Sequence, residues 1–146
     1  MENNNGNGLV KIKSQKLLKI MATKKMLGLL AYINLDNDMP VYTFIAKPDV
    51  LDIYNSFVKL YGKDDHSIDN REEWKYWNAE IYKDLSNQDT IVIRSYTAVT
   101  ELLNLGYGSM LMKTYKNSED NMKCFVFLAS PKIIDIKNKY EGERNI

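Results

Sequence analysis

Short segments of two different periodicities alternate along this sequence, and that alternation limits the fold more than any other feature. Residues 41–46 (VYTFIA), 90–94 (TIVIR) and 122–129 (MKCFVFLA) are rich in β-branched and aromatic side chains, which is typical of β-strands. Between these segments, apolar residues recur at intervals of three and four positions, which indicates amphipathic helices. The sequence therefore predicts an α+β protein, which we expect to be mostly helical.

The expected helices begin at residues that favour helix starts. Pro48 suits the first turn of one helix, and Asp69 or Asn70 can cap the next. Within that next helix, Trp74 and Trp77 fall on one side, so we expect both in the core. The predicted helices cover residues 14–34 (with a second start at Thr23), 48–62, 71–87, 96–104, 109–119 and 131 onward.

Composition defines the broad class of protein. The chain has 146 residues, 45% hydrophobic and 11% aromatic, as in a globular protein of one ordinary domain or two small ones. No apolar run reaches the ~20 residues of a membrane span, and the polar start MENNNGNG lacks a secretory h-region. We therefore expect a cytoplasmic protein that does not enter a membrane. The single cysteine, Cys124, excludes an intramolecular disulfide and is expected to be a buried thiol.

Charge is distributed unevenly, although the net charge is only +1. The first 26 residues hold six lysines and one acid, Glu2, which gives a local net charge of +5. Such a segment suits an anionic partner such as nucleic acid, and a solvated helix face is the alternative. We divide the chain into a flexible basic leader (1–13), an N-terminal unit (14–66) and a C-terminal unit (67–146).

The segment 102–117 (LLNLGYGSMLMKTYKN) has two competing interpretations. In the first, Gly106 and Gly108 cradle a phosphate, because glycine lets backbone N–H groups approach an anion. The segment then resembles the acetyl-CoA pyrophosphate loop of the GNAT N-acetyltransferases. The Arg/Gln position of that family falls on Leu103, and Val99 and Leu103 have helical spacing, which weakens the resemblance.

The second interpretation is a tight turn between two short helices. Gly106 would end the first helix in a left-handed conformation, and Ser109 would cap the second. The order helix, strand, helix, turn, helix, strand over residues 71–131 resembles a winged helix-turn-helix, with a looser copy over residues 14–62. The resemblance implies a winged-helix fold, or two tandem winged-helix-like units, with residues 109–119 as the helix that enters the major groove.

The resemblance also implies a set of residues at the DNA. Lysines neutralise phosphates, asparagine can pair with adenine, and a tyrosine in the turn can contact the backbone. The basic leader would add phosphate contacts. The residues expected to bind DNA are Tyr107, Ser109, Lys113, Thr114, Lys116, Asn117, Lys11, Lys13 and Lys16.

A weak internal similarity favours two units. At an offset of 49 to 50 residues, the segment 31–55 (AYINLDNDMPVYTFIAKPDVLDIYN) aligns with the segment 80–104 (EIYKDLSNQDTIVIRSYTAVTELLN). The alignment has five identities and the same helix–strand–helix order in both segments. The order of predicted helices and strands resembles that of plasmid replication and transfer regulators of low-GC bacteria. Some of those regulators carry two winged-helix units in one chain.

These observations favour a double-stranded DNA-binding protein that regulates or assists replication, transfer or transcription on a plasmid or phage. No acid–base pair, nucleophile or metal cluster in the sequence indicates an enzyme, so we expect no catalytic residue, metal or cofactor. A homodimer is an open option. Two other functions also stay open: the N-acyltransferase, and a phage or plasmid protein that binds a host protein, with Tyr76 beside the tryptophans in the interface.

Overall fold

The computed structural model describes residues 8–84 and 87–142, in which helices and strands both contribute, so the α+β class is confirmed. No helix in these two ranges has the length and apolar character of a membrane span. The strands are β1 (Leu9–Ile12), β2 (Leu30–Asp36), β3 (Met39–Ile45), β4 (Thr90–Ile93), β5 (Leu111–Lys116) and β6 (Lys123–Leu128). The helices are α1 (Gln15–Thr23), α2 (Pro48–Tyr61), α3 (Arg71–Trp74), α4 (Ala79–Lys83), α5 (Tyr96–Asn104) and α6 (Pro131–Lys137), with short turns η2 (Leu27–Leu29), η3 (His66–Ile68), η5 (Gly108–Met110) and η6 (Asn138–Gly142).

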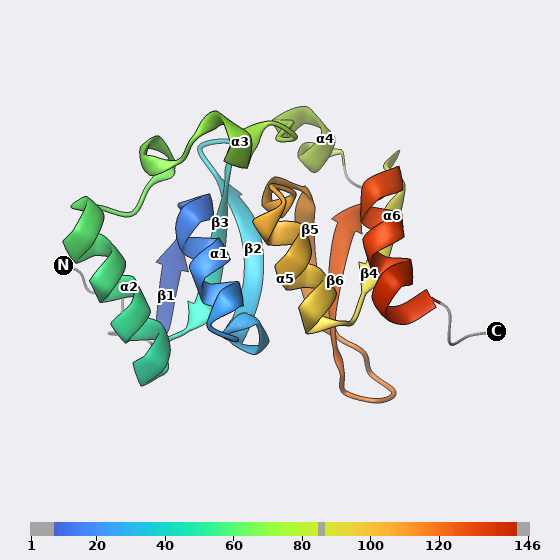
Figure 1. Cartoon of the computed structure of the whole chain (residues 1–146), viewed down its shortest axis with the longest axis horizontal. Helices are drawn as coiled ribbons and strands as arrows, with labels where there is room; N and C mark the ends of the chain where they lie inside the picture. The colour runs from blue at the N-terminus through green and yellow to red at the C-terminus, as the bar shows by residue number, and fades with distance from the viewer. Residues whose placement is uncertain (1–7, 85–86, 143–146) are drawn as a thin grey trace.

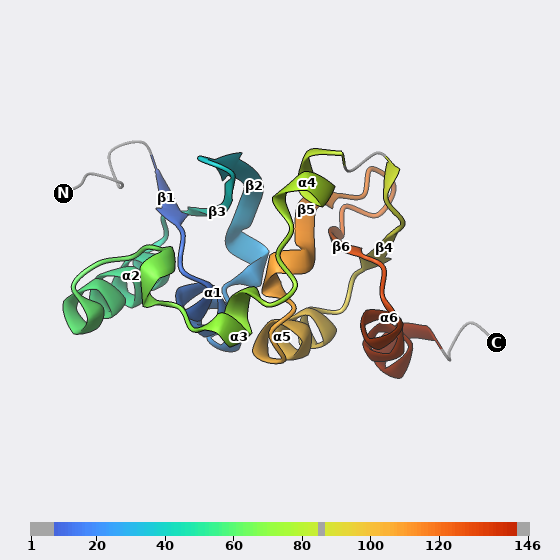
Figure 2. The same ribbon diagram turned by 90° about the horizontal axis from the view of Figure 1, so that it is seen from above.

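Two antiparallel three-stranded sheets form the centre of the molecule, with strand orders β1-β3-β2 and β4-β6-β5. Helices α1 and α2 lie against one face of the first sheet, and α5 and α6 lie on the same side of the second (Figures 1 and 2). The segment with α3 and α4 connects the two sheets along one end (Figure 1). The opposite faces of the sheets are not covered by α1, α2, α5 or α6 (Figure 2). We call these faces the helix-free side.

The two sheets belong to two copies of one unit, in which a strand, a helix, a short turn, a hairpin and a second helix follow in order. β4, α5, η5 and β5 each begin 81 residues after β1, α1, η2 and β2. Both copies also shift register at the same place, between Leu30 and Tyr32 in one and between Leu111 and Lys113 in the other. The second hairpin has a longer loop than the first, so α6 begins 83 residues after α2.

The duplication is visible in the sequence once the structure supplies the alignment. FIAKPDVLDIYN (44–55) and FLASPKIIDIKN (127–138) share six of twelve residues. The offset of 49 to 50 residues is wrong as a repeat, because it places β3 and α2 over β4 and α5. Each unit contains two strand–helix pairs, such as β1–α1 and β3–α2 in the first unit. The order of elements therefore also matches when the second pair of the first unit, β3–α2, is aligned with the first pair of the second unit, β4–α5.

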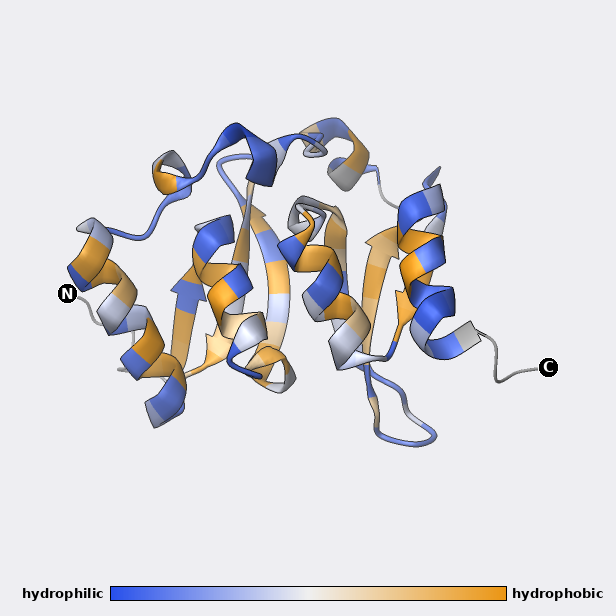
Figure 3. Cartoon of the chain, in the orientation of Figure 1, coloured by the Kyte–Doolittle hydropathy of each residue, from blue (hydrophilic) through white to orange (hydrophobic). Residues whose placement is uncertain are grey.

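The two units meet about an approximate two-fold axis that runs along the line of sight of Figure 1. β2 lies beside β5 and α1 beside α5, so each unit presents the same surface to the other, as in a symmetric dimer. Tyr42 Oη donates to the Gly108 carbonyl at 3.3 Å, and Lys123 Nζ donates to the Leu30 carbonyl at 2.8 Å. Buried apolar residues of both units form one hydrophobic cluster. Figure 3 marks the hydrophobic residues of the helices and strands in orange. The chain is therefore a pseudo-dimer with a shared core.

Residues 109–119 do not form the helix that a winged helix-turn-helix requires. Gly106 does end α5 in a left-handed conformation, with φ +96°. The chain then passes through η5 into strand β5, where Leu111 pairs with Phe127 of β6. The prediction of a second helix is wrong because pairing with a distant strand outweighs the local spacing of apolar residues.

The N-terminal region also differs from the prediction. β1 occupies the last part of the expected flexible leader (1–13), and Val10 and Ile12 in this strand are fully buried. Residues 1–7 lie outside the described residues. The helix expected over residues 14–34 is α1 alone, because the second half of that range pairs with β3 as β2.

The connecting segment is not the single helix expected over residues 71–87. It forms the short helices α3 and α4, and its buried side chain is Glu73 rather than a tryptophan. Trp74 and Trp77 are half-buried and stay outside the hydrophobic cluster. The boundary expected after residue 66 therefore falls inside a connection between the two units.

Candidate functional site

β1 and the residue that follows it, Lys13, place two lysines on the helix-free side. Side chains alternate between the two faces of a strand. Val10 and Ile12 belong to the core, so Lys11 and Lys13 lie on the opposite face. Lys11 is exposed and Lys13 is half-buried. The basic N-terminal segment thus offers these charges from a strand with a fixed direction.

β5 brings a third predicted residue to the same side. Phe127 of β6 belongs to the core, so its neighbour Val126 faces the other way, and Lys113 pairs with Val126. Both units carry their helices on one side, so the helix-free faces of the two sheets point in the same direction (Figure 2). The fold therefore brings Lys11, Lys13 and Lys113 together on one side of the molecule.

In the first sheet, a lysine and a tyrosine flank a buried threonine. Lys11 of β1 and Tyr32 of β2 both pair with Thr43 of the central strand β3. Thr43 is fully buried, and its Oγ1 has no hydrogen-bond partner among the described residues. Tyr32 keeps 42% of its surface exposed. This row presents a cation and an exposed aromatic ring on the same face.

In the second sheet, an arginine and a tyrosine flank Cys124. Tyr115 pairs with Cys124 and is 42% exposed, while Arg94 follows the last residue of β4 on the other side. The Arg94 guanidinium contacts the Cys124 thiol and lies 2.9 Å from the Asp120 carboxylate, and both contacts raise the pKa of Arg94. Cys124 is a buried free thiol, as the sequence predicts. This row also presents a cation and an aromatic ring.

Three residues that the sequence assigned to DNA contact are engaged inside the protein. Ser109 is only 2% exposed and lies in η5. Tyr107 stacks on Tyr76 with 4.5 Å between ring centroids. Thr114 Oγ1 donates to the Cys124 carbonyl at 2.9 Å. The prediction that these side chains form one exposed face is therefore wrong.

The remaining three predicted residues lie apart from the two rows. Lys16 is on α1, on the helix side, with its Nζ 3.7 Å from a Glu73 carboxylate oxygen. Lys116 follows Tyr115 in β5 and so faces the opposite way. Asn117 begins the hairpin loop, where its side-chain oxygen accepts the Glu119 N–H at 2.8 Å. Of the nine predicted residues, the fold unites only those on β1 and Lys113.

Tyr32, Arg94 and Tyr115 are not among the residues that the sequence predicts. Tyr32 was placed in a helix, although Asn37 and Asp38, which both have positive φ, form the two-residue turn of a hairpin. An Asn-Asp pair between two alternating segments is a usable hairpin signal. No comparable signal marks β5, because its hairpin loop is longer.

The glycines of the turn have packing explanations. Gly106 has the positive φ that ends α5. A Cβ at Gly108 would lie 2.1 Å from Gln15 Oε1, so any larger residue would force the buried Gln15 side chain to shift where α1 packs against η5. A helix, α5, leads into this turn where the acyltransferase loop needs a strand. The glycines therefore give no support to the phosphate cradle.

These features define a class: an internally duplicated α+β protein with two sheets and one helix-free side. Comparisons with protein-family models, with curated proteins and with solved structures found no match. Within residues 8–84 and 87–142, no group of three or more His, Cys, Asp or Glu side chains is placed to hold a metal ion. Function must therefore be argued from the site itself.

Proposed function

We propose that this protein binds single-stranded nucleic acid on the helix-free side of its two sheets. The observation that carries the proposal is the pair of rows, with Lys11 and Tyr32 on one sheet and Arg94 and Tyr115 on the other. Lysine and arginine neutralise phosphates, and exposed aromatic rings stack on unpaired bases. Sheets that offer both groups on one face are a recurrent platform for single strands.

The fold favours a single strand over a duplex. A duplex hides the faces of its bases and is read through its grooves, most often by an exposed helix. Residues 109–119 do not supply that helix. The lysines of α1 are also engaged, since Lys19 Nζ lies 2.8 Å from a Glu73 carboxylate oxygen and Lys16 lies nearby. The proposal keeps the nucleic-acid partner that the sequence suggested and replaces the duplex with an unpaired strand.

The charges on the helix-free side set the expected salt dependence. Lys11 and Lys113 pair with no carboxylate among the described residues, so they are available to phosphates. With Lys13, and with Arg94 once its exposed ion pair with Asp120 opens, they make four cations. At a slope of about −0.7 per neutralised phosphate, full engagement predicts a log–log salt slope near −3 for a single strand.

The test is a fluorescence anisotropy titration with a labelled oligothymidylate, its RNA counterpart and a duplex of the same length. We expect the single strands to bind more tightly than the duplex. Tyr32→Ala and Tyr115→Ala should each weaken binding by about fivefold or more, because one lost stack costs about 1–3 kcal/mol. Lys11→Ala should reduce the magnitude of the salt slope by about 0.7.

Matched controls use the helix side. Lys132→Ala on α6 removes a comparable exposed charge, and Tyr61→Ala on α2 removes a tyrosine that is 44% exposed. Both variants should bind as the wild type does. Equal loss of affinity in the controls, or tight duplex binding that is indifferent to Tyr32 and Tyr115, would count against the proposed surface.

A further inference from the structure

The duplication gives each unit its own set of candidate nucleic-acid contacts. Lys13 and Arg94 are at matching positions, because each directly precedes the serine that caps the first helix of its unit. They follow β1 and β4, which are the outer strands of the two sheets. Tyr32 and Tyr115 lie on the inner strands β2 and β5, and both are 42% exposed. Each unit thus has a cation at its outer edge and an aromatic ring on the strand beside the other unit.

The two tyrosines lie level with each other on the helix-free side. Lys123 Nζ donates across the interface to the Leu30 carbonyl at the start of β2, and Lys123 pairs with Lys116 of β5. In each sheet, the tyrosine belongs to the next residue pair along the hairpin. Since β2 and β5 run in opposite directions, both steps lead the same way from this contact (Figure 1).

Four side chains therefore form one line across both sheets, in the order cation, ring, ring, cation. Lys11 and Tyr32 form the first half of this line, and Tyr115 and Arg94 form the second. Two strands side by side fit this order, because the outer cations can neutralise both backbones while the rings stack bases of both strands. Lys113, two residues before Tyr115 on the same face, lies between the two backbones, where a lysine can donate to a base edge.

The two-fold axis sets the direction of each strand. It runs along the line of sight of Figure 1, so every element of one unit points the opposite way in the other. Gln15 at the start of α1 thus lies against Gly108, which follows the end of α5. A nucleic-acid strand has a 5′ and a 3′ end, so two sites related by this axis bind strands of opposite direction, as a symmetric dimer does on a palindrome.

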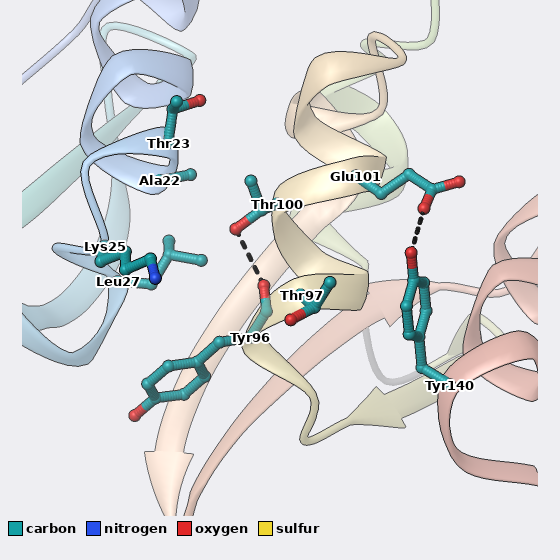
Figure 4. A pocket seen from close by; sticks show the side chains of 9 residues that line it. All are labelled: Ala22, Thr23, Lys25, Leu27, Tyr96, Thr97, Thr100, Glu101 and Tyr140. Atoms are coloured by element: carbon teal, nitrogen blue, oxygen red, sulfur yellow. Dashed lines mark hydrogen bonds between the residues drawn. The ribbon is translucent and has the colours of Figure 1, made fainter.

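A cleft on the helix side is unsuited to such a ligand. It has a volume of about 470 Å³ and lies between α1, α5 and η6 (Figure 4). The Glu101 carboxylate lines this cleft and accepts a hydrogen bond from Tyr140 Oη at 2.5 Å. Lys25 also lines it, and Glu101 balances that charge. Because a carboxylate repels phosphates, the cleft adds nothing to the contacts on the helix-free side.

We propose that the helix-free side holds two antiparallel unpaired strands at once, one on each sheet, with their backbones outside and their bases between. The inference rests on the proposed function and names its substrate class, which is an opened stretch inside a duplex. Such a stretch shares the two-fold symmetry of the protein, because its two strands run in opposite directions and continue into duplex at both ends. A hairpin loop, whose strand closes at one end, lacks this symmetry.

The experiment compares two oligothymidylates of the same length and charge by fluorescence anisotropy with the full chain. Each has two segments of about five nucleotides, near the lower end of single-strand site sizes. The flexible linker can cross between the sheets but cannot run the length of a segment. It joins a 3′ end to a 5′ end in the first oligomer, so the folded segments are antiparallel, and two 3′ ends in the second, so they are parallel. The first should bind at least about tenfold more tightly, because both of its segments engage one chain.

Variants and two further ligands complete the test. Tyr32→Ala and Tyr115→Ala each leave one intact sheet site, so either change should bring the two linked oligomers to about the same affinity. Tyr61→Ala on the helix side is the matched control and should keep the preference. A duplex with an internal stretch of about five T·T mismatches should bind more tightly than a hairpin whose loop holds the same number of thymidines.

The possible failures separate the inference from the function beneath it. Equal binding of the two linked oligomers by the wild type would overturn the inference and leave single-strand binding intact. A preference that survives Tyr32→Ala or Tyr115→Ala would also overturn it, as would tighter binding of the hairpin than of the opened duplex. Failure of both linked oligomers to bind at all would instead remove the proposed function, and the inference with it.

Discussion

The two halves of this chain have the same order of backbone elements, but different kinds of side chain fill the matching positions where the halves meet. In the first half, Gln15 Nε2 donates to Tyr42 Oη at 2.7 Å, and Tyr42 donates in turn to the Gly108 carbonyl of the second half. At the matching positions of the second half, Tyr96 packs edge-on against Phe125 with 5.6 Å between ring centroids. A buried polar network and an aromatic pair thus fill equivalent places.

The halves have in common the apolar core and the start of their first helix. Ser14 and Ser95 cap the first helix of each unit, and both accept an N–H from the residue three positions on. The difference lies at the start of that helix, where Asp69 accepts the N–H groups of Gln15 and Lys16 in the first unit. A duplicated backbone can therefore keep its core and helix starts while its surfaces take different partners.

The largest expected effect tests the shared core. Phe44 and Phe127 occupy matching positions in β3 and β6, and both are fully buried. Phe44→Ala and Phe127→Ala should each lower the free energy of unfolding by about 3–5 kcal/mol, through lost burial and a new cavity. Chemical denaturation checks this and should show one cooperative transition. Two separate transitions would mean that the halves fold independently.

The next effect tests the interface at the turns. Gly108→Ala should lower the free energy of unfolding by about 1–3 kcal/mol, because its Cβ would overlap Gln15 Oε1. Gly28 of η2 lies one position after Leu27, the counterpart of Gly108, and the nearest atom to a Cβ there is Tyr96 Oη at 3.4 Å. Gly28→Ala should therefore stay within about 0.5 kcal/mol of the wild type. Equal costs in thermal unfolding would contradict the assigned contact.

A smaller effect tests the backbone after the first helix of each unit. Lys25 and Gly106 are at matching positions and have φ of +67° and +96°. A left-handed conformation costs about 1–2 kcal/mol for a residue with a Cβ. Gly106→Ala should therefore destabilise by about 1–2 kcal/mol, whereas Lys25→Gly should stabilise by about 0.5 kcal/mol because the entropy cost of glycine offsets part of the relief. Calorimetry of both variants provides the comparison.

The smallest effect tests Glu73, the buried acid that accepts a hydrogen bond from Lys19 of α1. Burial raises the pKa of the Glu73 carboxyl, but hydrogen bonds from Lys19 and the Asn70 N–H outweigh burial, so its pKa lies below the ordinary value of 4.5. A lowered pKa stabilises the fold above the ordinary value, and this contribution is lost as the pH falls through the folded-state pKa. Glu73→Gln should cost about 0.5–1 kcal/mol at neutral pH.

The control for this last prediction is the pH profile. The difference in unfolding free energy between wild type and Glu73→Gln should shrink as the pH falls below 4.5. A difference that is constant from pH 7 to pH 3 would show that the carboxylate charge does not contribute. Thr100→Glu, which adds an acid on α5 at the position that matches Lys19, should leave this profile unchanged.

Strong local signals predicted about half of the elements. The strands expected at 41–46, 90–94 and 122–129 are β3, β4 and β6, and the helices that start at Pro48, Tyr96 and Pro131 begin there. β3 and β6 are central strands, so both of their faces are covered and their apolar runs are continuous. Such runs, and the proline or serine that starts a helix, can be recognised without knowing the rest of the fold.

β4 is an edge strand whose β-branched run TIVI could be predicted, but the other edge strands could not be predicted in the same way. β1, β2 and β5 each have one paired neighbour and mix polar with apolar residues. In β5, the sequence LMKTYK satisfies helical spacing as well as strand alternation. Pairing with Phe127 and its neighbours in β6 decides between them. The candidate site lies on these edge strands, so most of it was also missed.

By itself, the sequence determined the α+β class, the central strands, the helix starts and the buried state of Cys124, because each depends on neighbouring residues. Only the tertiary structure decided how the two copies align with each other. It also decided the rows that place Tyr32 near Lys11 and Tyr115 near Arg94. Those rows depend on hydrogen bonds between strands distant in sequence. A one-residue change of register would turn every side chain of an edge strand to the other face.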